Sequence, residues 1–354
     1  MKTLDYIIVG RGLAGSLLAN ELTNQGKKIA IVSDESMGSS SLVAGGMFNP
    51  VTGKHLGKTW LADKLFPYFF EYYQALDKEL QASFFHPIGV FRPFSNEENK
   101  AYFARQMEHN DLYDYLELQA PDSLLEQDIK SELGGLNTKM AGWVDIKVML
   151  EKIKEKLSSK GQYVLNEFVD YKQIKINSER VFYKDFEAKA IIFCDGFFAK
   201  NNPWFSWLPF NPVKGETVIA EVENYNVTKI MNQGKWVMPL GKNKVRLGAT
   251  YSWHRLDFEN TDEAREELIS KTGKFLKRPV KVLGQQAGVR PSTTDRRPFF
   301  GVHPKEKNVF CFNGLGTKGV SIAPFFVEQF LGFLSGEKDI HPEANIERFY
   351  SLFS

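Results

Sequence analysis

The chain has 354 residues, of which 43% are hydrophobic and 25% charged, so we expect about two folded domains with an ample apolar core, not a disordered or small disulfide-rich protein. Its 45 Lys and Arg residues nearly balance its 43 Asp and Glu residues, so the overall charge favours neither nucleic acid nor an anionic membrane as a partner. Cys194 and Cys311 lie in apolar runs, and no apolar segment approaches the length of a membrane span. The scattered histidines predict no metal site. We therefore expect a cytoplasmic protein without a metal.

The first 33 residues have the pattern of a strand, a helix and a second strand. Residues 6–9 and 28–32 are apolar runs, and residues 16–25 place apolar side chains at helical spacing. Between the first strand and the helix, residues 10–15 read GRGLAG. These glycines permit a tight turn and the close approach of a pyrophosphate to the helix N-terminus. The segment therefore predicts a dinucleotide-binding site.

The acidic residue that usually binds the adenosine ribose is displaced in this sequence. Its expected place, counted from Gly10, falls on Ser33, which Asp34 and Glu35 follow. Ser33 can hydrogen-bond a hydroxyl, whereas neighbouring residues of a strand point to opposite faces. We keep Ser33 and Asp34 as candidate ribose contacts. For Arg11 we favour a solvated side chain over a phosphate contact.

The rest of the chain indicates a second domain inserted into the first. Residues 59–80 predict an aromatic-rich helix and residues 145–158 an amphipathic helix. Residues 211–285 contain strand-like runs joined by polar turns, which favours an antiparallel sheet. The fold class expected is α/β, with a Rossmann-type domain and an inserted α+β substrate domain built on an antiparallel sheet. The predicted boundaries are 1–80, 139–210 and 286–354 for the nucleotide domain, and 81–138 and 211–285 for the substrate domain.

Together these motifs resemble the D-amino acid oxidase-like family of FAD-dependent oxidoreductases, which includes glycine oxidase and sarcosine oxidase. The resemblance rests on the order and spacing of IIVGRGLAGSLLANEL, SSSLVAGGM, AGWVDIKVML, AIIFCDG, NPVKGE, WVMP, VRLGATYSW, GVRPSTTDRRPFFG and NGLGTKGVSIAP. It implies bound FAD and a substrate domain over the flavin. Members that attach flavin covalently carry a Cys where this sequence has Val289, so we expect noncovalent FAD.

The resemblance also implies which residues contact the cofactor. Ser40, Ser41 and residues 44–46 would line the pyrophosphate, the ribityl chain or the flavin ring, and Val169 would offer backbone groups to the adenine. The residues expected to bind FAD are Gly10, Gly12, Leu13, Ala14, Gly15, Ser33, Asp34, Ser40, Ser41, Ala44, Gly45, Gly46, Val169, Gly196, Gly314, Gly316, Thr317, Lys318 and Gly319.

Two basic residues are candidates for the chemistry at the flavin. Arg290 lies in GVRP, where glycine oxidase-like enzymes place the arginine that holds the substrate carboxylate; a guanidinium fork pairs both carboxylate oxygens. The alternative is a structural ion pair. Lys318 matches a lysine that sarcosine oxidase-like members place near flavin N1, where a positive charge stabilises the reduced flavin; its alternative is a solvated side chain. Thr317 replaces a second arginine of glycine oxidase-like members, so substrate handling is expected to differ.

Two aromatic residues complete the predicted catalytic set. Trp236 stands where relatives often have a tyrosine that forms a wall of the substrate cavity, and its alternative is a place in the sheet core. Tyr251 follows a predicted strand and is expected to project into the cavity. Neither is needed as a base, because a neutral amine lone pair can drive hydride from the α-carbon to flavin N5.

The function expected is FAD-dependent oxidation of the C–N bond of an amino acid or a related carboxylate-bearing amine. The imine formed is hydrolysed, and O2 is the expected acceptor. We expect a small-molecule amine as partner, and neither a membrane nor a nucleic acid. One alternative is an oxidase acting on the carboxymethylaminomethyl group of a tRNA wobble uridine, which the near-neutral charge disfavours. Others are a non-catalytic flavin-binding module and an NAD-dependent dehydrogenase.

Overall fold

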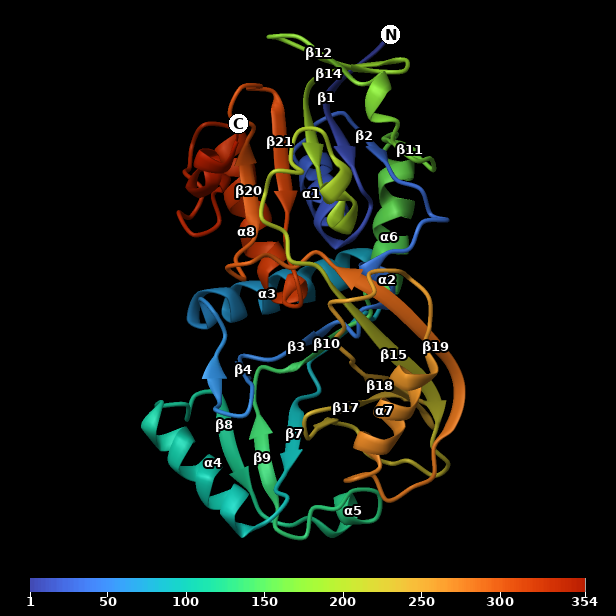
Figure 1. Ribbon diagram of the computed structural model, residues 1–354, viewed down its shortest axis with the longest axis vertical. Coiled ribbons are helices and arrows are strands. Elements are labelled where there is room, and N and C mark those ends of the chain that lie inside the picture. The colour runs from blue at the N-terminus through green and yellow to red at the C-terminus, as the bar shows by residue number, and fades with distance from the viewer. Residues whose placement is uncertain (354) are drawn as a thin grey trace.

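A largely parallel eight-stranded sheet lies at the end of the molecule that contains both termini (Figure 1). The computed structural model describes residues 1–353. The central strand β1 (Lys2–Val9) pairs in parallel with β2 (Ile29–Val32) on one side and with β14 (Phe186–Phe193) on the other. The outer members are β11 (Tyr163–Leu165) beside β2, and β21 (Val309–Asn313), β20 (Phe299–Val302), β13 (Val181–Tyr183) and β12 (Lys175–Ile176) on the side of β14.

Helices cover one face of this sheet. They are α1 (Leu13–Asn24), α3 (Ala62–Leu80), α6 (Ile146–Ser159) and α8 (Gly319–Leu334), and their apolar faces form one core with Ile8 and Ile31 of the sheet. The opposite face packs against the short helices η1 (Tyr171–Gln173) and η3 (Ile346–Leu352) and against residues 204–210, which follow the short helix η2 (Gly196–Asn201). Because both faces are covered, the parallel strands have nearly continuous apolar sequences.

A second eight-stranded sheet occupies the other end of the molecule, and α3 crosses between the two (Figure 1). In order its strands are β19 (Lys281–Arg290), β15 (Val213–Glu221), β18 (Lys244–Gly248), β17 (Trp236–Gly241), β16 (Ile230–Asn232), β7 (Val90–Pro93), β9 (Gly135–Thr138) and β8 (Leu116–Gln119). All neighbours are antiparallel except β7 and β16, which are parallel. The smaller elements are α2 (Ser40–Val43), α4 (Glu97–His109), α5 (Ser123–Glu126), α7 (Asp262–Thr272), the sheet of β3 (Met47–Phe48), β10 (Gly142–Val144) and β6 (Phe85–His86), and the hairpin of β4 (Val51–Thr52) and β5 (Gly57–Lys58).

The expected α/β fold class is confirmed, with differences in detail. The antiparallel sheet expected within residues 211–285 also contains strands from residues 90–138, and its strand β19 continues to Arg290. The aromatic-rich helix begins at Ala62 and not at residue 59. The domain boundaries stay a prediction. Within residues 1–353, no helix is both long and apolar enough to cross a membrane.

A proline in α8 shows how the two helices α3 and α8 depend on each other. Pro324 lacks an N–H group, so it cannot donate to the carbonyl of Val320 one turn earlier. The hydroxyl of the buried Tyr73 of α3 donates to this carbonyl at 2.9 Å. A side chain from a neighbouring helix thus replaces the missing backbone hydrogen bond.

We expect Tyr73→Phe to lower the free energy of unfolding by about 1–3 kcal/mol, because the Val320 carbonyl would remain buried without a donor. Urea titration of the FAD-bound protein measures the change. Tyr68→Phe on the same helix is the control, since the Tyr68 hydroxyl makes no hydrogen bond within residues 1–353. Equal stability of the Tyr73 variant and the wild-type protein would contradict this account.

Candidate active site

A cavity of about 280 Å³ lies where the ends of the parallel strands meet the second sheet. Its wall combines the turn after β1, the segment around α2, the ends of β14 and β21, and parts of β15, β17 and β19. Most of the predicted site residues lie in this wall: Gly10, Gly12, Leu13, Ala14, Ser33, Asp34, Ser40, Ser41, Ala44, Gly45, Gly46, Val169, Gly196, Trp236, Tyr251, Arg290, Gly316, Thr317 and Gly319. The fold therefore brings residues from distant parts of the chain to one cavity.

The glycines of the first turn leave no room for side chains. Gly10 has φ of +100°, and a Cβ there would lie 2.4 Å from the carbonyl oxygen of Cys194. A Cβ at Gly15 would lie 1.9 Å from the oxygen of Gly10. Close packing of this turn places Leu13 and Ala14, the first residues of α1, in the cavity wall, and the first N–H groups of a helix have no acceptor within the helix. These residues fit the pyrophosphate of a dinucleotide such as FAD.

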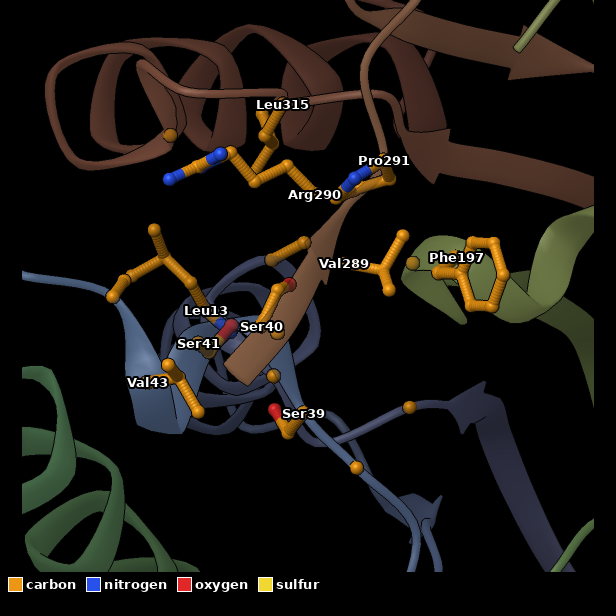
Figure 2. A pocket seen from close by; sticks show the side chains of 18 of the residues that line it. Leu13, Ser39, Ser40, Ser41, Val43, Phe197, Val289, Arg290, Pro291 and Leu315 are labelled. Atoms are coloured by element: carbon orange, nitrogen blue, oxygen red, sulfur yellow. The ribbon is translucent and has the colours of Figure 1, made fainter. Parts of the chain in front are cut away.

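Ser41 of α2 closes this turn from the other side. Its Oγ accepts a hydrogen bond from the backbone N–H of Leu13 at 3.0 Å, and a Cβ at Gly12 would lie 3.0 Å from the same oxygen. Figure 2 shows Leu13, Ser40 and Ser41 together in the cavity wall. The hydroxyl thus connects the first turn to the loop that follows β2.

The expectation of a solvated Arg11 is wrong. Its side chain is 9% exposed and forms an ion pair with Glu35, which also accepts a hydrogen bond from Lys154 of α6 at 2.5 Å. Glu35 pairs with both cations, so the Arg11 guanidinium has a counter-ion within the protein. Sequence reasoning missed this pair because 24 residues separate its partners.

Ser33 and Asp34 both lie in the cavity wall, with different hydrogen bonds. The backbone of Ser33 donates to the carbonyl of Leu165 and accepts from the N–H of Glu167. The Asp34 Oδ1 atom accepts from the N–H and the hydroxyl of Ser36, and these bonds lower the pKa of Asp34. Ser33 therefore keeps a free side chain toward the cavity, while one oxygen of Asp34 already has two donors.

Trp236 lies where β17 meets the loop after α2. A Cβ at Gly45 would lie 2.7 Å from its indole ring, and a Cβ at Gly248 of β18 only 2.2 Å from it. The indole is buried, lines the cavity and also packs in a core cluster with Met238. It is therefore both cavity wall and sheet core, and its fit requires glycine at both flanking positions.

Arg290 is the last residue of β19, and its side chain extends along the wall of the cavity (Figure 2). The guanidinium lies against Gly215, where an added Cβ would be 2.0 Å from Nη2. Its Nη1 donates to the carbonyl of Thr250 at 3.3 Å. The carbon Cζ lies 4.6 Å from the centre of the Tyr251 ring.

No carboxylate of residues 1–353 pairs with Arg290, so the expected alternative of a structural ion pair is not what the structure contains. Burial lowers the pKa of Arg290, and the Tyr251 ring opposes this shift. Because the ordinary pKa of arginine lies far above neutral pH, the guanidinium stays charged at neutral pH. A half-buried cation whose only acceptors are the carbonyls of Lys214 at 3.5 Å and Thr250 at 3.3 Å within residues 1–353 is suited to bind an anionic ligand.

Asp195 at the end of β14 is a wall residue that sequence reasoning missed. Burial raises the pKa of Asp195 to about 6. Its hydrogen bonds from Asn202 at 2.8 Å, Asn313 at 2.9 Å and Tyr171 at 3.3 Å act in the opposite direction and lower the pKa. Asn313 in turn accepts from the N–H of Gly314 at 2.7 Å. Asp195 thereby joins the loops after β14 and β21. The signal for it in the sequence was an acidic residue directly after an apolar strand.

Three predicted residues lie outside the cavity wall. Gly15 packs in the turn, and Gly314 packs against Thr293 and Phe299. Lys318 is half-buried at the start of α8, where its carbonyl accepts from the N–H groups of Ser321 and Ile322. Burial lowers the pKa of Lys318 to about 8. A role for this lysine beside the flavin stays a prediction.

Comparisons with known proteins agree with this arrangement. A family model described as "FAD dependent oxidoreductase" matches residues 5–326. The glycine oxidase of Pseudomonas putida is 24% identical over 136 residues, which are 38% of this chain and only 37% of the relative, so that match spans little more than a third of its length. The glycine oxidase of Bacillus subtilis is 23% identical over 351 residues, covering 90% of each chain.

Two further matches extend over nearly the whole chain. The crystal structure of glycine oxidase from Geobacillus kaustophilus superposes with a TM-score of 0.79 at 19% identity, covering 97% of this chain and 98% of that one. The tRNA 5-methylaminomethyl-2-thiouridine biosynthesis bifunctional protein MnmC of Vibrio campbellii is 19% identical over 377 residues, covering 93% of this chain and 56% of the relative. At these identities the structural match establishes the fold.

The raised pKa of Asp195 predicts a pH-dependent contribution to stability. Between its ordinary value near 4 and the folded-state value of about 6, the unfolded chain loses the proton while the folded chain keeps it. Stability from this residue therefore falls as pH rises through this window, by about 3 kcal/mol. Urea titrations of the FAD-bound wild-type and Asp195→Asn proteins from pH 4 to pH 7 isolate the effect as the difference between their unfolding free energies. A difference that does not vary with pH would rule it out.

Proposed function

The chain belongs to the family of FAD-dependent oxidoreductases, and from this premise we propose that it oxidises the C–N bond of an amino acid or related amine that carries a carboxylate. The observation that carries the proposal is Arg290, a guanidinium without a carboxylate partner within residues 1–353, in the same cavity wall as the glycine turn. The matched glycine oxidases support this choice of chemistry.

In the proposed function, different residues of the cavity wall bind the substrate, orient it and exclude water. FAD, the cofactor of this family, accepts a hydride at flavin N5 when bound. Arg290 binds the substrate carboxylate, and its fixed position against Gly215 sets the place of the adjacent α-carbon. The indole of Trp236 forms an apolar part of the wall and excludes water beside it. In the proposed reaction, water would hydrolyse the imine product and O2 would take up the two electrons from the cofactor.

The proposed reaction requires the uncharged form of the amine. The acidic wall residues Asp195, Glu167 and Asp34 are each engaged by hydrogen bonds within the protein. None of these three carboxylates pairs with Arg290. A neutral amine has the free lone pair that oxidation at the α-carbon requires, so the wall does not need to supply a base.

A second candidate function is oxidation of a carboxymethylaminomethyl group on a tRNA wobble uridine. The match to the MnmC protein favours it, and this group also carries a carboxylate next to an amine. The balanced charge of the chain disfavours it, because proteins that bind RNA backbones gain affinity from many basic residues. A tRNA affinity that falls steeply with salt would move the proposal to this substrate. A non-catalytic flavin module would not need Arg290 at all.

We expect Arg290→Leu to slow anaerobic flavin reduction by a carboxylated amine by about 10- to 100-fold, because a charge-assisted, bidentate contact is lost. A stopped-flow screen of amino acids, N-methyl amino acids and imino acids identifies the amine, and flavin absorbance measures the rate. Arg297→Leu is the matched control, since Arg297 pairs with Glu343 away from the cavity wall. The proposal fails if no carboxylated amine reduces the flavin, or if the Arg290 variant is reduced at the wild-type rate.

We expect FAD to be held without a covalent bond. Val289, which stands at the position of the attaching cysteine, is buried in β19 and lines the cavity. The thiol of Cys194 in the wall is also buried, and burial raises its pKa, so it is poorly reactive. Denaturation in acid followed by centrifugation should leave the yellow cofactor in the supernatant. Flavin that stays with the pellet would show covalent attachment.

A further inference from the structure

Two large aromatic side chains are exposed beside the carboxylate site. Tyr251 and Trp253 each expose 54% of their surface, although apolar side chains of this size are usually more buried. Their ring centroids are 6.2 Å apart and their planes differ by 24°, so the rings stack. Neither side chain is explained by packing in the core.

The backbone holds the two rings in place. Ser252, which lies between them, exchanges two backbone hydrogen bonds of 2.9 Å with Lys214 of β15. Alternate residues of an extended segment point to the same side, so this pairing directs Tyr251 and Trp253 together. We call the pair the aromatic platform. Its geometry is set by β15, and not by a freely moving loop.

The aromatic platform begins at the cavity wall and leads away from it. Tyr251 lines the cavity and lies under the guanidinium of Arg290, with 4.6 Å from its ring centre to Cζ. Trp253 does not line the cavity and extends the stack beyond its wall. A ligand whose carboxylate binds Arg290 therefore has a rigid aromatic surface beside it.

The charges near the aromatic platform are already neutralised. Lys235, whose Nζ lies 6.0 Å from the Tyr251 ring, forms an ion pair with Glu267 at 3.1 Å. Arg255, two residues beyond Trp253, pairs with both Asp257 and Glu259. The surface thus offers aromatic faces and no unpaired charge from these neighbours, which matches an uncharged planar group.

We propose that Tyr251 and Trp253 form a subsite for a planar aromatic group of the substrate, while Arg290 holds its carboxylate. This inference rests on the proposed function of the same site. It narrows the substrate class to amines that carry both a carboxylate and an uncharged aromatic group. Stacking on aromatic side chains supplies affinity with little dependence on the identity of the ring.

The test compares two carboxylates that differ by an aromatic ring. Phenylacetate and acetate are titrated into the FAD-bound protein, and changes in flavin absorbance give both Kd values. We expect phenylacetate to bind more tightly, and Trp253→Ala to reduce the ratio of the two affinities about fivefold. Trp253→Phe should retain most of the ratio. Tyr113→Ala, which removes a side chain that is 51% exposed and lies outside the cavity wall, is the matched control.

The outcomes separate this inference from the proposed function. An unchanged ratio in Trp253→Ala, or equal tightness of the two ligands in the wild-type protein, overturns the subsite while leaving carboxylate binding intact. Binding of acetate that does not weaken in Arg290→Leu overturns the proposed function itself. A uracil-1-acetate affinity that exceeds that of phenylacetate and falls in Trp253→Ala supports the subsite and identifies a nucleobase as the ring it takes.

Discussion

The site depends on a positive charge that the protein leaves without an internal counter-ion. Arg290 is surrounded by the flat surface of Gly215, the ring of Tyr251 and the carbonyl of Thr250, none of which carries a negative charge. Removing a cation from water without a partner costs stability. Arg290 lines a cavity, and under the proposed function a ligand carboxylate there would supply the missing counter-ion.

Glycines allow the second sheet to lie close to the segment around α2 at the cavity. Glycines at 45 and 248 let the indole of Trp236 lie between β18 of the second sheet and the segment after α2. Gly288 of β19 likewise lies close to α2, since an added Cβ would be 3.2 Å from the Cα of Ser40. Because backbone approaches side chain or backbone directly at these positions, Arg290 and the glycine turn line the same cavity. Under the proposed function, this closeness would orient a substrate against the cofactor.

Local patterns made much of the fold predictable. The strand, glycine turn and helix of the first 33 residues follow from apolar spacing and from the backbone freedom of glycine, and the structure has each of these elements. The switch to an antiparallel sheet was also visible as polar turns between short apolar runs. The parallel pairing of β7 with β16 could not be predicted from the sequence. The two strands are about 140 residues apart, and nothing in either sequence indicates which strand it pairs with.

The sequence by itself determined the glycine turn, the type of the main elements and the nature of the candidate anchor at Arg290. These follow from residue type and short-range spacing. Only the tertiary structure decided which charges are already paired: Arg11 pairs with Glu35, whereas Arg290 pairs with no carboxylate of residues 1–353. It also decided that Tyr251 and Trp253 stack beside Arg290. The physical reason is that charge pairing and stacking are set by distances between side chains that the folded backbone brings together from far along the chain.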